Sequence, residues 1–203
     1  MTEKKDGIGS MIKLGLTLAI FAVASCTVLA LVNNVTSPVI KENNIRKANE
    51  AMKAVFPEAE SFDIPDDAVC GTTKSGKTTI DSIHLAKKGG ETVGAVVQIS
   101  GPTYDRSTIM VGLDMKGPVT GMQFLENTDT PGFGQKASDP TFKVKSGHTF
   151  YGQFTNADSF RGFVAGETFD AISGATITSV GVATMMDDAC EFMKECLNIG
   201  GIK

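Results

Sequence analysis

Residues 14–32, which read LGLTLAIFAVASCTVLALV, form a run without a single charged side chain. In an α-helix these 19 residues would extend about 28 Å, close to the hydrocarbon thickness of a bilayer, which is about 30 Å. A charged side chain is costly inside a membrane, and none interrupts the run. The sequence therefore predicts one transmembrane helix over 14–32, preceded by a short tail, residues 1–13.

The residues that flank this run predict its orientation. Lys4, Lys5 and Lys13 precede the run, whereas no basic residue follows it before Lys41. In membrane proteins the basic flank of a span is usually retained on the cytoplasmic side. We therefore expect a single-pass protein of the bacterial inner (cell) membrane, with a cytoplasmic N-terminus and an extracytoplasmic domain.

Two other N-terminal arrangements compete with a retained span. The apolar core of a cleaved signal peptide is about 7–15 residues long, which is shorter than this run. Residues 23–26, Val-Ala-Ser-Cys, resemble the lipobox of bacterial lipoproteins, in which the cysteine becomes the lipidated first residue. The apolar run continues for six residues after Cys26, which a cleaved lipoprotein does not need. The retained span is the favoured interpretation, with lipidation of Cys26 as an alternative.

The charge outside the run argues against nucleic acid as a partner. The chain carries a net charge of −4, and residues 33–203 hold 16 basic and 21 acidic side chains. Nucleic-acid binding relies on a basic face, which a mildly acidic domain lacks. We expect no binding of DNA or RNA.

The cysteines follow neither a disulfide pattern nor a metal-binding pattern. Cys70, Cys190 and Cys196 lie outside the apolar run, and an odd number argues against a disulfide framework. Cys190 and Cys196 are six residues apart on a predicted helix, about 9 Å along its axis, beyond the reach of one bridge. With no C-x-x-C motif and two isolated histidines, the sequence predicts no metal site and structural roles for all three cysteines.

Beyond the membrane run, the hydrophobic pattern predicts an α+β fold. Residues 33–56 are expected to form an amphipathic connector helix, because apolar residues recur three and four positions apart until Pro57 ends the helix. Residues 57–203 would then form the extracytoplasmic domain.

Within that domain, the pattern predicts an antiparallel sheet packed against helices. Runs of alternating or β-branched residues around glycine turns predict two hairpins, with strands over 80–86, 92–99, 108–114 and 118–125. A periodic apolar stripe predicts a helix over 178–197, closed by Gly200-Gly201. A sheet followed by one closing helix, without β-α-β alternation, is typical of α+β domains.

One segment fits the sequence pattern of a phosphate-binding loop, but its flanking residues do not fit the strand and helix that such a loop requires. Residues 71–78, GTTKSGKT, satisfy the P-loop pattern, in which Lys77 would contact the terminal phosphates and Thr78 a magnesium ion. A P-loop follows a buried strand and begins a helix. Residues 64–70 are too polar for such a strand, and residues 79–84 alternate like a strand. We expect a solvated loop rather than a nucleotide site.

A second motif, residues 170–179 (DAISGATITS), begins the predicted C-terminal helix. Its small residues would let the backbone approach a ligand closely, and the free amides and dipole of a helix N-terminus attract an anion. These features describe a phosphate site with hydroxyl groups beside it, although a Ser/Thr-rich helix cap has the same composition. From the residues alone, either Thr176 or Thr178 could carry a covalently attached phosphate.

The same motif carries a family resemblance. Residues 170–176, Asp-x-x-Ser-Gly-Ala-Thr, resemble the flavinylation motif of the FMN-binding domain family. Residues 127–134, NTDTPGFG, resemble the family's His-x-Glu-Thr-Pro-Gly-Leu-Gly element, with Asn127, Asp129 and Phe133 in place of its His, Glu and Leu. The single span, the hairpins and the final helix are similar to the G subunits of Rnf-type ferredoxin:NAD oxidoreductases, which translocate ions.

The resemblance implies a covalently bound FMN, transferred from FAD by a flavin transferase and attached through its phosphate to the hydroxyl of Thr176. It implies a binding set without a catalytic residue: Ser173, Gly174, Ala175 and Thr178 around the phosphate, and Thr130, Pro131, Gly132, Phe133 and Gly134 beside the ring. Phe133 would be an apolar wall for the ring or a simple loop anchor. Asp170 would be recognised by the transferase or would bind magnesium during attachment. Otherwise it would act as a negative charge near the helix N-terminus. The turn over 101–106 departs from the family's glycine-rich turn, so no contact is assigned to it.

The function implied by the resemblance is electron relay in a membrane-bound, ion-translocating oxidoreductase, because FMN can pass one or two electrons. The chain would be a redox subunit with no activity alone, and its partners would be integral membrane and iron–sulfur or flavin subunits. The alternatives are the C subunit of a sodium-pumping quinone reductase, which usually has a longer soluble domain, and a stand-alone extracytoplasmic flavoprotein. A membrane-anchored binding or assembly protein is the non-redox alternative.

Overall fold

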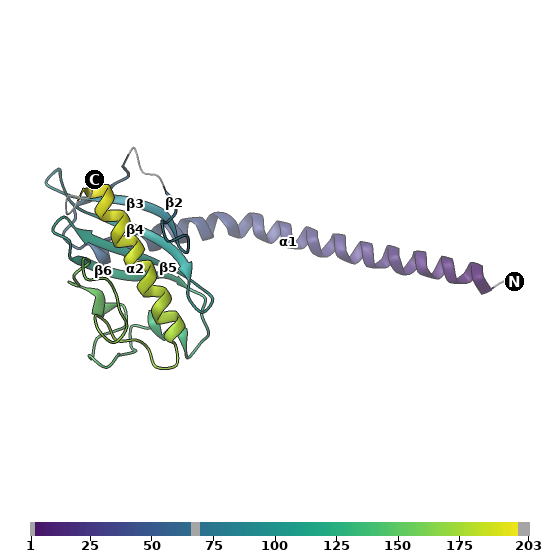
Figure 1. The fold of residues 1–203 in the computed structure, drawn as a ribbon. Helices are drawn as coiled ribbons and strands as arrows, with labels where there is room; N and C mark the ends of the chain where they lie inside the picture. The colour runs from purple at the N-terminus through teal and green to yellow at the C-terminus, as the bar shows by residue number, and fades with distance from the viewer. Residues whose placement is uncertain (1–2, 66–69, 199–203) are drawn as a thin grey trace. The chain divides into compact units, whose positions relative to one another are not determined.

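The computed structural model describes residues 3–65 and 70–198. The chain forms two compact units, Met1–Arg46 and Lys47–Lys203. The first unit consists of helix, and the second contains an antiparallel sheet and a C-terminal helix, as Figure 1 shows. The predicted α+β fold with one N-terminal apolar helix is confirmed.

The N-terminal helix, α1, extends without interruption over Glu3–Val55. Among the described residues it is the one helix long and apolar enough to cross a membrane, and its apolar window is not buried in protein. The connector expected over 33–56 is not a separate element, because α1 continues through Pro38 and ends two residues before Pro57. An interior proline removes one backbone hydrogen bond but leaves the neighbouring turns able to form theirs.

The last turns of α1 belong to the second unit. Their buried side chains contact one face of the sheet in a small hydrophobic cluster, made of Ala51, Met52, Val55, Phe56, Ala86, Val96 and Met110. The second compact unit begins at Lys47, ten residues before the position at which the sequence places the start of the domain. Pro57 marks where the helix ends, whereas the packing of the helix on the sheet begins earlier.

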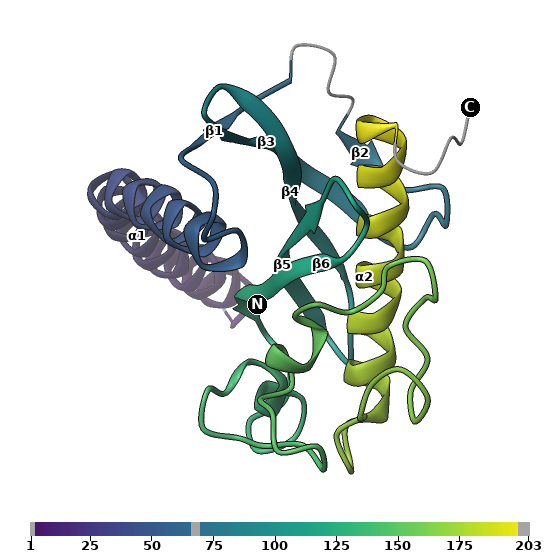
Figure 2. The same ribbon diagram turned by 90° about the vertical axis from the view of Figure 1, so that its left-hand side faces the viewer.

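Six strands form one sheet in the order β1-β3-β4-β5-β6, with β2 paired to β3 (Figure 2). The strands are β1 Ser61–Asp63, β2 Gly71–Thr72, β3 Thr79–Lys88, β4 Glu91–Pro102, β5 Arg106–Asp114 and β6 Val119–Asn127. All pairings are antiparallel, and the two predicted hairpins are confirmed as β3–β4 and β5–β6. The sequence did not indicate β1 and β2, because three and two residues are too few to show an alternating pattern.

Both faces of the sheet are covered, which explains why β4 is apolar at successive positions. Neighbouring residues of a strand point to opposite faces. Val97 and Ile99 belong to the large core, whereas Val96 belongs to the small cluster with the end of α1. A strand buried on both faces cannot show the alternation of a half-exposed one.

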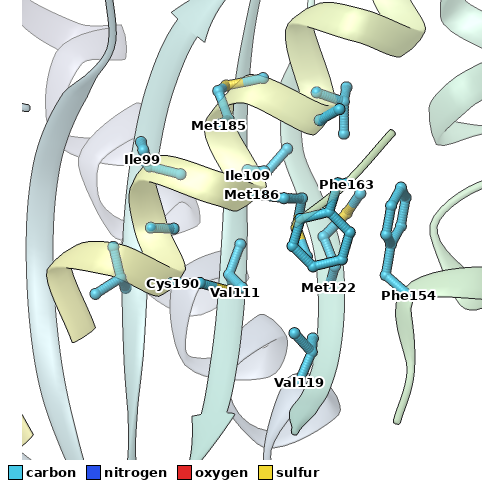
Figure 3. Packing of buried hydrophobic residues seen from close by; sticks show 14 of the residues in the cluster. Ile99, Ile109, Val111, Val119, Met122, Phe154, Phe163, Met185, Met186 and Cys190 are labelled. Carbon is cyan, nitrogen blue, oxygen red and sulfur yellow. The ribbon is translucent and has the colours of Figure 1, made fainter. Parts of the chain in front are cut away.

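The C-terminal helix, α2, covers the larger core face over Thr176–Leu197. Met185, Met186 and Cys190 of this helix pack with Ile109 and Val111 of β5 (Figure 3). The helix begins two residues before the predicted start, and its C-cap is Asn198 in the left-handed conformation, with a φ of 56°. The predicted Gly200-Gly201 closure lies outside the described residues.

The long segment between β6 and α2 contains two short 3-10 helices, η1 Gly134–Ser138 and η2 Gly152–Phe154. Four of its phenylalanines form a ring cluster, with centroids 5.4 to 6.2 Å apart, made of Phe150, Phe154, Phe163 and Phe169. Such rings bury a large apolar area each. They belong to the large core and so attach this irregular segment to it.

The P-loop-like residues 71–78 form a hairpin rather than a P-loop. Gly71 lies opposite Ile80 in the β2–β3 pairing, so a strand follows where a P-loop requires a helix. The hydroxyls of Thr73, Ser75 and Thr78 donate to Oδ2 of Asp188 on α2, at 3.2, 2.7 and 2.5 Å. The segment therefore attaches the sheet to α2.

The cysteines differ in their environments. Cys190 is buried in the core, whereas Cys70 and Cys196 are exposed, so a structural role fits Cys190 alone. Burial raises the pKa of the Cys190 thiol to about 12, which keeps it protonated and unreactive. Sequence position could not show the difference between Cys190 and Cys196, because both are on α2 and their exposure depends on which side of this helix faces the sheet.

Candidate functional site

The site begins at the N-terminus of α2. Ala175 is the N-cap and no side chain caps the helix. The first intrahelical bond runs from the amide of Ser179 to the carbonyl of Ala175, at 3.0 Å. The amides of Thr176, Ile177 and Thr178 consequently have no acceptor among the described residues. These amides and the helix dipole make this end of α2 suited to an anion.

A cavity of about 520 Å³ lies at this helix end. Its lining comes from three segments that are far apart in the sequence: Tyr104 between β4 and β5, Thr130, Phe133 and Gly134 between β6 and η1, and Gly174, Ala175, Thr176, Ile177 and Thr178 at the start of α2. The two motifs identified in the sequence are therefore brought together. The volume is within the range of cofactor sites, about 300–1,000 Å³.

The structure distinguishes the two candidate threonines. The side chain of Thr178 is 1% exposed, and its hydroxyl donates to Oδ2 of Asp129 at 2.5 Å. Thr176 is exposed at the cavity, and its hydroxyl has no hydrogen-bond partner among the described residues. A hydroxyl that is buried and bonded to a carboxylate is a poor acceptor for a bulky group, so the geometry favours Thr176.

Asp129 connects the three segments that line the cavity. It is completely buried, and its Oδ1 accepts from the hydroxyl of Thr103 at 2.6 Å and from the amide of Asp105 at 2.8 Å. These bonds fix the residues on either side of Tyr104, while the bond from Thr178 fixes the start of α2. The sequence resemblance assigned Asp129 no role, because its neighbours become visible only in the fold.

The carboxyl of Asp129 is ionised at neutral pH. Burial raises its pKa, but hydrogen bonds from the hydroxyls of Thr103 and Thr178 and from the amides of Asp105 and Tyr104 outweigh burial, so the pKa lies below its usual value. Asp129 is thus a buried negative charge at the back of the cavity.

Gly134 is required by close packing around this carboxylate. A Cβ at position 134 would lie 2.5 Å from Oδ2 of Asp129 and 2.5 Å from Oγ1 of Thr178, well inside contact distance. The carbonyl of Gly134 also accepts from Nδ2 of Asn127 at 3.2 Å, and Oδ1 of Asn127 accepts from the amide of Asp129 at 3.1 Å. Asn127, which replaces the family's His, therefore holds both ends of this loop.

Two aromatic rings border the cavity and are largely exposed. The exposed fraction is 67% for Tyr104 and 57% for Phe133. A ring that anchors its loop would be buried, so the exposure of Phe133 favours the apolar wall over the loop anchor. Tyr104 was missed by sequence reasoning, because its turn departs from the family pattern and a single tyrosine in a polar turn carries no signal.

Four of the residues expected at the site do not line the cavity: Pro131, Gly132, Asp170 and Ser173. Gly132 has a φ of 77° and, with Pro131, forms the turn that presents Phe133, whose amide donates to the carbonyl of Thr130 at 3.2 Å. The carboxylate of Asp170 accepts from the amide of Ser146 at 2.8 Å and so holds the chain before the motif.

Comparisons with known proteins identify the family of the chain. The FMN-binding domain family matches residues 103–191, and the N-terminal region of RnfG matches residues 1–55. A relative from Acetobacterium woodii is the G subunit of a Na⁺-translocating ferredoxin:NAD⁺ oxidoreductase complex. The two proteins are 30% identical over 190 residues, which cover 85% of this chain and 86% of the relative.

Two further relatives are named as G subunits of ion-translocating oxidoreductase complexes. The protein of Photorhabdus laumondii is 31% identical over 172 residues, which cover 81% of each chain. The protein of Yersinia pestis is 29% identical over 188 residues, covering 89% of this chain and 88% of that protein. The chain therefore belongs to the RnfG family, the G subunits of ion-translocating oxidoreductase complexes, and it contains an FMN-binding domain.

Proposed function

We propose that this chain is the electron-relay subunit of a membrane-bound, ion-translocating ferredoxin:NAD oxidoreductase and that FMN is attached covalently to Thr176. The observation that carries the proposal is the unbonded, exposed hydroxyl of Thr176 at a cavity of about 520 Å³, beside three amides without acceptors among the described residues. When bound, FMN supplies one- and two-electron transfer.

The residues present suit this cofactor. The amides of Thr176, Ile177 and Thr178 would hold the phosphate, with Ser173, Gly174 and Ala175 shaping the backbone around it. Gly174 has a φ of 80°, which lets the chain turn sharply into the helix. Tyr104 and Phe133 would border the ring, and Thr130 and Gly134 would form the wall between them. Thr178 contributes its amide, because its hydroxyl is bonded to Asp129.

Attachment requires a flavin transferase and FAD. The Oγ of Thr176 would form a bond to the FMN phosphorus of FAD, the pyrophosphate bond would break, AMP would leave and the hydroxyl proton would pass to a base. Asp170 does not line the cavity, so we assign it to recognition by the transferase rather than to the bound cofactor. Its distance in sequence from the start of α2 and its bond to Ser146 argue against a helix-charge role.

The membrane position proposed for the protein rests on α1. This helix would anchor the chain in the membrane, and the lysines at positions 4, 5 and 13 favour an N-terminus in the cytoplasm of a bacterial cell, with the FMN domain on the other side. Its partners would be the integral membrane and iron–sulfur or flavin subunits of the complex. The names of the relatives favour this assignment over the C subunit of a quinone reductase or a stand-alone flavoprotein.

The experiment is to compare three full-length proteins, the wild type, Thr176→Val and Thr178→Val, each expressed with a flavin transferase. We expect the wild type and Thr178→Val to fluoresce as denatured gel bands and to show a mass increase of FMN less one water. Thr176→Val should be dark and unmodified. A flavin retained in Thr176→Val would overturn the attachment site, and an unmodified wild type would favour the non-redox binding or assembly protein.

A further inference from the structure

The carboxylate of Asp129 is a buried charge, and within residues 3–65 and 70–198 no cation balances it. Every group that donates to it is neutral: two threonine hydroxyls and the backbone amides of the 104–105 turn. No basic side chain among the described residues forms an ion pair with Asp129. A charge in this position keeps a long-range field, because hydroxyl and amide donors stabilise it without cancelling it.

This charge lies directly behind the wall of the cavity. Its Oδ2 is bonded to Thr178, which lines the cavity, and lies against Gly134, another lining residue, where a Cβ would be 2.5 Å away. Its Oδ1 holds the turn that carries Tyr104, a third lining residue. The carboxylate is therefore separated from the cavity by one layer of small side chains and backbone.

We propose that Asp129 lowers the reduction potential of the flavin held in this cavity, by placing an uncompensated negative charge behind its wall. This inference rests on the proposed function, since it requires FMN at this site. It gives Asp129 a role beyond holding the three segments together.

The physical reason is the change in charge on reduction. Reduction adds an electron to the ring system, and the repulsion from a fixed carboxylate makes the reduced form less favourable than the oxidised form. Water screens this repulsion poorly, because Asp129 is completely buried and the cavity wall contains no charged side chain among the described residues. Removing the charge should make reduction easier and raise the potential.

The test is a redox titration of full-length, flavinylated protein, comparing wild type with Asp129→Asn. Asparagine keeps the shape of the side chain. Its Oδ1 can accept from Thr103 and Asp105, and its Nδ2 can donate to the oxygen of Thr178, so the bonds can persist without the charge. Asp129→Ser provides a second neutral variant, and Asp129→Glu retains the charge with the residue type found in the family.

Two controls separate charge from local geometry. Thr103→Val removes one donor from Asp129 and leaves the charge in place. Asp139→Asn removes a carboxylate that also accepts from a threonine hydroxyl and an amide, but both belong to Thr141, which does not line the cavity.

We expect both neutral variants to favour the reduced flavin by about tenfold in the one-electron equilibrium constant, a rise of about 59 mV. Thr103→Val and Asp139→Asn should stay close to wild type, as should the potential of whatever fraction of Asp129→Glu carries flavin. An unchanged potential in the neutral variants would overturn the proposal. A flavin present in Asp129→Glu but absent from both neutral variants would overturn it too, because the charge would then serve assembly. A wild type without flavin would instead refute the proposed function.

Discussion

Gly134 illustrates how a single residue can determine whether the site forms. Its missing side chain leaves the room that Oδ2 of Asp129 and Oγ1 of Thr178 occupy, each 2.5 Å from where a Cβ would be. The neighbours are short side chains held by their mutual hydrogen bond, so they have little freedom to move away. At the scale of the residue, the site therefore depends on the lack of a side chain at Gly134 as much as on the functional groups around it.

We predict that Gly134→Ala abolishes most flavin attachment and lowers the free energy of unfolding by about 1–3 kcal/mol, the usual cost of overpacking a closed site. The matched control is Gly132→Ala in the same loop. That position has a φ of 77° but open space around it, so strain alone should cost about 1 kcal/mol and attachment should persist. In-gel flavin fluorescence per protein and urea unfolding measure the two effects. Normal attachment in Gly134→Ala would contradict the prediction.

At the scale of elements, the position of α2 on the sheet is set by a polar contact as well as by the core. Asp188 of α2 accepts hydroxyl hydrogen bonds from Thr73, Ser75 and Thr78 at the β2–β3 turn. Thr78 is 1% exposed, so without this acceptor its hydroxyl would lose a bond that water cannot replace. The P-loop-like residues 71–78 therefore form a hydroxyl-rich turn that contacts α2.

We predict that Asp188→Ala lowers the free energy of unfolding by about 1–3 kcal/mol, because it removes the acceptor of the buried Thr78 hydroxyl. Glu191→Ala on the same helix is the control. Its carboxylate is largely exposed and lies 3.7 Å from Nζ of Lys74, so its loss should cost less than about 1 kcal/mol. Urea unfolding of the full chain in detergent, followed by circular dichroism, makes the comparison. Equal losses in the two variants would show that the Asp188 contact adds no stability.

For the molecule as a whole, the compact unit that contains the FMN-binding domain also includes the end of α1. Met52, Val55 and Phe56 are buried against the sheet together with Ala86 and Met110. Fully burying a side chain of this size contributes about 1.5–3 kcal/mol, and a domain is stable by only about 5–15 kcal/mol in total. A domain that starts after this helix would lose a large part of its stability.

We therefore predict different behaviour for two fragments expressed with a flavin transferase. The fragment 47–203 should be soluble, carry flavin and unfold cooperatively, because it retains the whole small cluster. The fragment 57–203 should aggregate, or bind a dye for exposed apolar surface. The prediction fails if 57–203 melts at the same temperature as 47–203.

Much of the fold could be predicted because its signals are local. The uncharged run over 14–32, the glycine turns of the β3–β4 and β5–β6 hairpins and the stripe of α2 each arise from residues a few positions apart. The short strands β1 and β2 escaped detection because their pairing with β3, rather than their own residues, makes them strands.

The features of the site also fall into those that local sequence predicts and those that only the fold shows. The sequence by itself determined the long apolar helix, the β3–β4 and β5–β6 hairpins and the two motifs that meet at the cavity, since these depend on neighbouring residues. Only the tertiary structure decided that Thr178 bonds to Asp129 while the Thr176 hydroxyl has no partner in the described part of the chain. It also decided that Tyr104 borders the cavity and that Asp129 is buried behind it. The bonds of Asp129 to Thr103 and Thr178 span 26 and 49 residues, and no local pattern encodes contacts over such separations.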